Sequence, residues 1–118
     1  MTDYSIKFTF NNSTSHKLTL INAELFAGSW DDNMSPQTDI LAGYTCYFKA
    51  SSNSSSTGIS GRIYYNSEDG MVMLSFLNPS SDGDGAGGTS PPQYDLSWTD
   101  SGGDNAAIVF TLTHASSS

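Results

Sequence analysis

Residues 56–79, STGISGRIYYNSEDGMVMLSFLNP, decide the fold. Both halves of this stretch are rich in β-branched, aromatic and aliphatic residues that recur at every second position, which predicts two strands. The segment 68–70, Glu-Asp-Gly, separates them, and acidic residues followed by glycine mark a tight hairpin turn. We therefore predict a β-hairpin at the centre of the domain, with Gly58 and Gly61 marking a bulge or a close backbone approach.

The rest of the chain repeats this pattern of short strands separated by turn signals. The same alternation marks five further segments, residues 4–10, 17–26, 40–50, 93–99 and 106–114. Regularly spaced strands without a helical period predict an all-β protein, and we expect an antiparallel β-sandwich of about seven to eight strands. We expect a single domain over residues 1–118 with a frayed tail at residues 116–118. The first two segments are expected to pair as a hairpin.

The charge of the chain restricts its partners. Twelve acidic residues against four basic ones give a formal net charge of −8 over 118 residues. Phosphate contacts require clustered Lys and Arg, so the composition argues against nucleic acid and against anionic membranes. Neutral partners, such as zwitterionic lipids and uncharged sugars, stay open.

Signals for export and for membrane insertion are missing from the sequence. The N-terminal residues, MTDYSIKF, hold no apolar signal-peptide core, and no run approaches the roughly 20 apolar residues of a membrane-spanning helix. The single cysteine, Cys46, lies in an apolar alternating run and is expected to be a buried, inert thiol. We expect a cytoplasmic protein, or one exported without a conventional signal peptide.

No catalytic signature stands out. His16 and His114 lie near the two ends of the chain, and the sequence holds no nucleophile elbow, metal-ligand pair or paired-carboxylate motif. We therefore expect a protein that is not an enzyme. Asp82 and Asp84, in Ser-Asp-Gly-Asp-Gly, are spaced so that their carboxylates can converge on Ca²⁺, although a solvated turn explains the same residues. No other cofactor is expected.

One loop combines the groups that recognise sugars. Aromatic rings stack on sugar faces, while neighbouring carboxylates and amides bond to sugar hydroxyls. Trp30, Asp31, Asp32 and Asn33 supply both kinds of group in one segment, and they are the best candidate ligand site. The alternative is that Trp30 packs against the core of the sandwich. Tyr64 is added as an outward-facing ring of the central hairpin.

Several short motifs follow one another in a recognisable order. These are Gly28-x-Trp30, then Pro36 with Ile40 and Gly43, then T-G-x-x-G-x-I-x-Y over residues 57–65, then an acidic-Gly turn, an aliphatic strand and Pro79. The set resembles the actinoporin-like β-sandwich group of sea-anemone cytolysins and fungal fruit-body lectins. Its Thr-Gly-x-x-Gly step also resembles the aegerolysins, which are small acidic lipid-binding sandwiches.

The resemblance implies a toxin-like or lectin-like module that binds glycans or lipid headgroups through loops at one end. Pore-forming members insert an N-terminal amphipathic helix, whereas this chain starts with a strand, so autonomous pore formation is not expected. Their phosphocholine site uses aromatic rings after the proline matched by Pro79, and here the next aromatic residue is Tyr94. Since a quaternary ammonium group binds among aromatic rings, the resemblance assigns ligand positions to Pro79 and Tyr94 alone.

The leading hypothesis is a non-enzymatic recognition module that binds glycans or membrane lipid headgroups. Glycans are preferred because the loops are polar, acidic and poor in aromatic residues. A second hypothesis is a lipid-binding cytolysin component of aegerolysin type that needs a partner protein. A third is a self-assembling homo-oligomer in which residues 4–10 or 106–114 pair as edge strands between chains.

Overall fold

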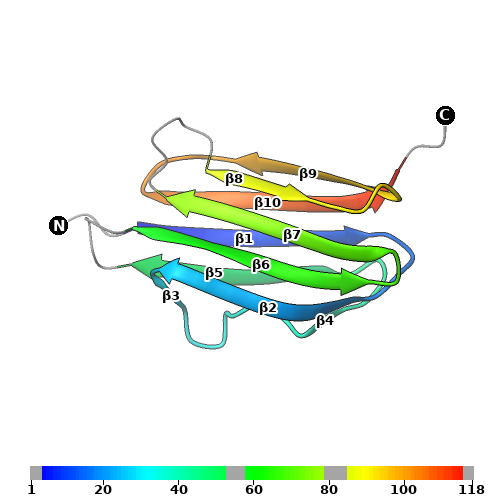
Figure 1. Ribbon diagram of the computed structural model, residues 1–118. Helices are drawn as coiled ribbons and strands as arrows, with labels where there is room; N and C mark the ends of the chain where they lie inside the picture. Colours follow the sequence, from blue (N-terminus) through cyan, green and yellow to red (C-terminus); the bar gives the residue numbers. More distant parts are fainter. Residues whose placement is uncertain (1–3, 53–57, 79–84, 116–118) are drawn as a thin grey trace.

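A computed structural model describes residues 4–52, 58–78 and 85–115 of the chain. These residues form strands and no helix, so the described part of the chain holds no helix able to cross a membrane. The ten strands are β1 (Tyr4–Ser13), β2 (Leu18–Ala27), β3 (Ser29–Trp30), β4 (Asp39–Ile40), β5 (Thr45–Ser52), β6 (Ile59–Ser67), β7 (Gly70–Asn78), β8 (Ala86–Thr89), β9 (Tyr94–Asp100) and β10 (Asn105–His114). They pack as two layers (Figure 1).

Each layer is a five-stranded sheet. Sheet A has the order β3-β5-β1-β10-β9, and sheet B has the order β4-β2-β6-β7-β8. Every neighbouring pair is antiparallel except β1 and β10, the first and last strands, which run parallel. The predicted all-β sandwich is confirmed. The structure has ten strands where about seven to eight are expected, because it includes the two-residue strands β3 and β4.

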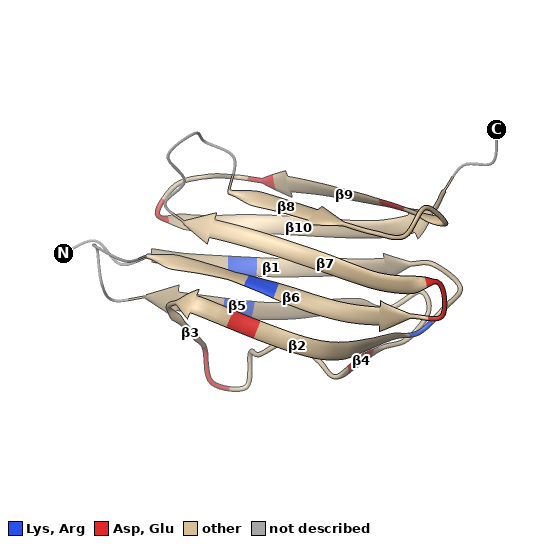
Figure 2. Cartoon of the chain, in the orientation of Figure 1, with Lys and Arg blue, Asp and Glu red and all other residues tan. Residues whose placement is uncertain are grey.

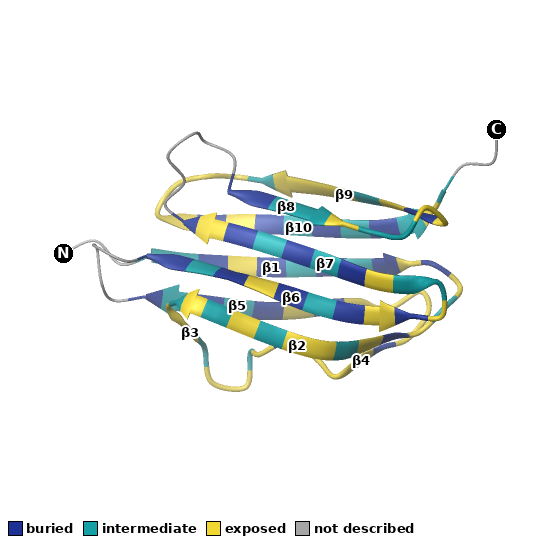
Figure 3. Ribbon diagram, viewed as in Figure 1, coloured by how far each residue is buried: buried dark blue, intermediate teal, exposed yellow. Residues whose placement is uncertain are grey.

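The predicted central hairpin is confirmed as β6 and β7 of sheet B. Their register runs from Ile59 opposite Asn78 to Ser67 opposite Gly70, so the turn lies where the acidic-Gly segment predicts it. One side of each strand is buried and the other faces solvent, as the alternating bands of Figure 3 show. The hairpin occupies the interior of the sheet because β2 pairs with β6 and β8 pairs with β7.

The predicted hairpin of residues 4–10 and 17–26 is wrong. β1 lies in sheet A between β5 and β10, and β2 lies in sheet B beside β6. Asn12 bends the chain between the layers, since its Oδ1 accepts hydrogen bonds from Thr14 N (3.2 Å) and Thr14 Oγ1 (2.7 Å). Each strand carries an apolar face, and each turns that face into the core from its own sheet.

The third hypothesis, in which residues 4–10 or 106–114 pair as edge strands between chains, names the wrong strands. β1 and β10 pair with each other in the interior of sheet A, with their residues in register from Ser5 opposite Asn105 to Ser13 opposite Thr113. β9 and β3 end that sheet, and β4 and β8 end the other. Residues 4–10 and 106–114 therefore offer no free edge for a second chain.

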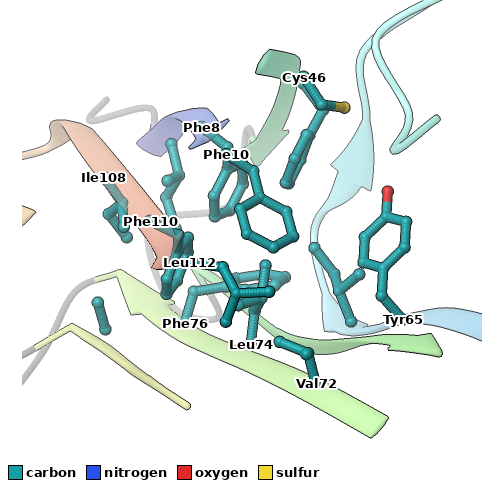
Figure 4. Packing of buried hydrophobic residues seen from close by; sticks show 14 of the residues in the cluster. Phe8, Phe10, Cys46, Tyr65, Val72, Leu74, Phe76, Ile108, Phe110 and Leu112 are labelled. Atoms are coloured by element: carbon teal, nitrogen blue, oxygen red, sulfur yellow. The ribbon is translucent and has the colours of Figure 1, made fainter. Parts of the chain in front are cut away.

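The core between the sheets is rich in aromatic rings (Figure 4). Phe8 of β1 stacks on Phe48 of β5 at 4.7 Å and meets Phe76 of β7 edge-on, also at 4.7 Å. Phe10 lies edge-on to Tyr65 and Phe110. Since aromatic pairs add about 0.5–1.5 kcal/mol beyond the area they bury, these contacts hold the two layers in one arrangement.

Two ionisable groups of the core, Cys46 and Tyr65, are expected to make the stability of the protein sensitive to alkali. Burial raises the pKa of Tyr65, and the adjacent Cys46 thiol raises it further; burial also raises the pKa of Cys46, which is buried as predicted. The Tyr65 hydroxyl donates to the Gln37 carbonyl oxygen at 2.7 Å. Above the unfolded values of about 8.5 for cysteine and about 10 for tyrosine, the unfolded chain binds fewer protons than the folded protein, so the free energy of unfolding falls.

We expect the urea midpoint to be insensitive to these groups below about pH 8.5 and to fall progressively above that value. In Tyr65→Phe the fall above about pH 10 becomes shallower, because the substituted ring has no proton to lose. Tyr64→Phe, on the opposite face of β6, is the matched control. Parallel midpoint curves for the wild type and Tyr65→Phe between pH 9 and 11 contradict this account.

Candidate functional site

The sequence-predicted ligand loop begins with a packing residue. Trp30 is half-buried, and its ring lies 6.1 Å from Phe8, 5.9 Å from Phe48 and 6.0 Å from Phe76, measured between centroids. Three core rings therefore pack against the indole, which is only partly accessible to solvent. The structure places Trp30 in the packing role that the sequence leaves open as an alternative.

The polar residues of the same loop are held against β5. Asp31 N donates to Lys49 O at 2.9 Å, and Asp31 Oδ2 lies 3.6 Å from Lys49 Nζ. Asp32 and Asn33 are exposed, and Asn33 adopts a φ of 60°. Their role as ligand residues stays a prediction, but the Trp30 ring that would stack on the sugar beside them packs against the core.

The other predicted ligand residues lie apart from that loop. Tyr64 is on the outer face of sheet B, opposite Met73 and Asn22. Pro79, Asp82 and Asp84 lie outside the described residues. Among the residues that the structure describes, no group of three or more His, Cys, Asp or Glu side chains is placed to hold a metal ion.

Tyr94 joins a cluster that sequence reasoning missed. It is buried, and its hydroxyl donates to Asp69 Oδ2 at 2.7 Å. Burial raises the pKa of Tyr94, and the Asp69 carboxylate, which accepts the hydrogen bond from its hydroxyl, raises it further. The Tyr94 ring also lies 5.7 Å from the His114 ring and 6.4 Å from the His16 ring. The tyrosine carried over from the resemblance is therefore a hydrogen-bond donor beneath two histidines.

Both histidines of the chain meet at this place. Their rings are 5.7 Å apart, although His16 follows β1 and His114 ends β10. His16 Nδ1 lies 2.8 Å from Glu68 Oε1, and His16 Nε2 lies 3.7 Å from Asp69 Oδ2. Ser15 N donates to His114 Nε2 at 2.9 Å. The parallel pairing of β1 with β10 brings these two ends of the chain together.

Beside the cluster, the chain presents an exposed apolar turn. All four residues from Leu41 to Tyr44, Leu-Ala-Gly-Tyr, are exposed, with 49% of Leu41 and 62% of Tyr44 accessible to solvent. Tyr44 N donates to Leu41 O at 3.0 Å, and Gly43 adopts a φ of 78°, which residues with a Cβ rarely reach. This apolar turn therefore has a defined conformation despite its exposure.

Asn12 holds the apolar turn from behind. Asn12 N donates to Tyr44 O at 3.0 Å, and Asn12 O accepts from Gly43 N at 2.9 Å. The buried side-chain amide donates to Leu41 O at 3.2 Å and to His16 O at 2.8 Å. One side chain thus ties the apolar turn to the histidine cluster.

These features define one end of the sandwich, which we call the turn end. It consists of the turns at residues 13–17, 41–44, 67–70 and 90–93, on the right in Figure 1. The turns contact one another, since a Cβ on Gly70 would lie 3.1 Å from Pro91 Cγ. The turn end combines a rigid apolar projection with exposed acidic residues, as the red band between β6 and β7 shows (Figure 2). It is the candidate functional site.

Comparisons with known proteins bear on the fold. No protein-family model matches the sequence, and no curated protein matches it. Among solved structures, the chain is similar to the lipid binding protein Nakanori, with a TM-score of 0.73 and 15% sequence identity over 92% of this chain and 70% of that one. At this identity the likeness establishes a shared fold alone, so it bears on the actinoporin-like resemblance only at the level of the fold.

Proposed function

We propose that this protein is a non-enzymatic recognition module that attaches to zwitterionic membrane surfaces through its turn end. The observation that carries the proposal is the exposed apolar turn, Leu41 to Tyr44, which the buried Asn12 holds in one conformation. The similar structure is described as that of a lipid binding protein, and a shared fold at low identity adds general support.

The apolar turn has the chemistry of an interfacial anchor. Burying a leucine or an aromatic side chain contributes roughly 1.5–3 kcal/mol, and the exposed parts of Leu41 and Tyr44 are available for this. Tyrosine suits the boundary between headgroups and acyl chains, because its ring is apolar and its hydroxyl stays hydrated. Since the turn is already ordered, little conformational entropy is lost on binding.

The charges of the turn end favour a zwitterionic surface. The net charge of −8 repels anionic lipids. The exposed Glu68 carboxylate and the Asp69 carboxylate lie beside His16, close to the apolar turn. At this place they attract the ammonium group of a zwitterionic headgroup. The preference for glycans, which rests on the polar and acidic loops, stays a prediction, but the Trp30 ring is less available to a sugar because it packs against three core rings.

Sedimentation with vesicles tests the proposal. We expect the wild type to pellet with phosphatidylcholine–sphingomyelin vesicles and to pellet less when phosphatidylserine is added. Tyr44→Ser is expected to weaken binding about tenfold, because about 1.4 kcal/mol of apolar burial is lost. Tyr47→Ser is the matched control, since Tyr47 is equally exposed, at 62%, but lies on the outer face of sheet A.

The control must bind vesicles like the wild type. No pelleting with any zwitterionic composition, or equal pelleting of Tyr44→Ser and the wild type, contradicts the proposed function. Hits on a glycan array in the absence of vesicle binding would favour the alternative hypothesis, in which the loops bind a glycan.

A further inference from the structure

A groove crosses the outer face of sheet B, away from the turn end. Its volume is about 290 Å³, and its walls include the apolar side chains of Phe26 and Leu77. Between the walls lie the polar side chains of Ser60, Arg62 and Ser75. The groove thus joins an aromatic ring to hydrogen-bonding groups on two strands that the central hairpin fixes in register.

A β-bulge directs Phe26 into solvent at this place. The register of β2 with β6 shifts between Leu25, opposite Gly61, and Ala27, opposite Ser60, so that Phe26 is the extra residue. Bulges bend a strand and re-aim a side chain, and they are frequent beside functional sites. The ring is 63% exposed. The backbone thus presents an aromatic face at the wall of the groove.

The polar groups of the groove include both donors and acceptors. The Arg62 guanidinium donates only, whereas the hydroxyls of Ser60 and Ser75 donate and accept. Glu24 of β2 is the cross-strand partner of Arg62, so its carboxylate lies next to the groove without lining it. The acidic band on β2 and the basic band on β6 lie side by side in Figure 2. Because this neighbouring carboxylate offsets the charge of Arg62, we expect the groove to favour a neutral ligand over an anion.

We propose that this groove binds a neutral pyranose ring of a glycan, with Phe26 stacked on the sugar's C–H face. A sugar offers one apolar face and several hydroxyls, which matches the ring of Phe26 beside Arg62 and the two serines. A purely aliphatic ligand leaves the guanidinium and hydroxyls without partners at a cost of about 1–3 kcal/mol each. The site is separate from the turn end and does not depend on its function.

Two-dimensional amide NMR of the ¹⁵N-labelled protein, titrated with the methyl glycosides of glucose, galactose and N-acetylglucosamine, tests the proposal. At least one glycoside is expected to produce saturable shifts at residues 24–27, 60–62 and 75–77. Phe26→Ala is expected to weaken this binding roughly fivefold to tenfold, and Phe26→Trp to restore it. Ile21→Ala is the matched control, because Ile21 is the exposed extra residue of the other β2 bulge.

A second arm distinguishes a soluble glycan from a glycolipid headgroup. The variant Tyr44→Ser is sedimented with phosphatidylcholine vesicles with and without glucosylceramide, so that binding through the groove is separated from binding through the apolar turn. Glycoside-induced shifts at the groove residues support the proposed sugar site. Pelleting of Tyr44→Ser that requires glucosylceramide, and that is lost when Phe26→Ala is added, supports it as well. Failure of both arms, or binding that Phe26→Ala leaves unchanged, overturns the proposal.

Discussion

Replacing Trp30 by alanine is expected to lower the free energy of unfolding by about 3 kcal/mol, as truncation of a large packed ring does. The indole fills the space between Phe8, Phe48 and Phe76, at the place where β3 closes the edge of sheet A. Its removal leaves a cavity that rigid strands on both sides cannot fill. Chemical denaturation followed by circular dichroism measures the loss.

Two controls separate packing from ligand binding at this loop. Trp30→Phe keeps an aromatic ring and is expected to recover part of the lost stability, while Asp32→Ala, at an exposed position, changes stability by less than about 0.5 kcal/mol. If Trp30→Ala retains wild-type stability, the ring does not pack as described, and its role as a sugar platform becomes the better interpretation.

Replacing Gly61 by alanine is expected to cost about 3 kcal/mol or more. Gly61 lies on the buried side of β6, where a Cβ would collide with the Glu24 carbonyl oxygen and would lie 2.9 Å from Phe76 Cζ. The first neighbour is backbone of a paired strand and the second is a core ring, so neither moves without breaking contacts. We expect the variant to unfold at a much lower denaturant concentration or to accumulate unfolded.

Gly87→Ala is the matched control for this effect. Gly87 is also a strand glycine of sheet B, but a Cβ there would meet only the Ser75 hydroxyl at 3.0 Å, a group that can rotate away. Its stability is expected to stay within about 1 kcal/mol of the wild type. Equal denaturation midpoints for Gly61→Ala and Gly87→Ala contradict the close approach of β2 to β6.

The sequence predicted the sandwich and its central hairpin because local signals are sufficient for both. Period-two alternation marks each strand, and the acidic-Gly turn sets the register of β6 with β7. The sequence left a bulge or a close backbone approach open at Gly61, and the structure shows the close approach. Two bulges in β2, at Ile21 and Phe26, interrupt the alternation that the sequence predicts for residues 17–26.

The pairing of the other strands was not predictable in the same way. The turn after β1 resembles a hairpin turn, yet the buried Asn12 and Thr14 make it a crossing between sheets. Nothing in the alternation of β1 distinguishes a neighbour in the same sheet from one across the core. The parallel pairing of β1 with β10 depends on contacts about a hundred residues apart in the chain, as in the hydrogen bond from Ser5 Oγ to Asn105 Oδ1.

The candidate site depends on those same long-range pairings. His16 and His114 were set aside because they lie near opposite ends of the chain, and only the completed sheet brings their rings together. The apolar turn lies inside the segment 40–50 that the sequence predicts as one strand, whereas the structure places it between β4 and β5. A search for apolar residues next to a strand-breaking glycine finds Leu41 and Tyr44 from sequence.

The position of the apolar turn on a bound membrane is the most direct test of the central claim. Ala42→Cys places a reactive thiol at the exposed tip of the turn, while the buried Cys46 stays unlabelled, so an environment-sensitive fluorophore reports from one place. Ala107→Cys, on the exposed outer face of sheet A, is the matched control. With phosphatidylcholine–sphingomyelin vesicles, we predict a blue shift and quenching by lipid-bound quenchers for the label at position 42 and neither at position 107. A label at position 42 that stays in water while the protein is bound contradicts the account.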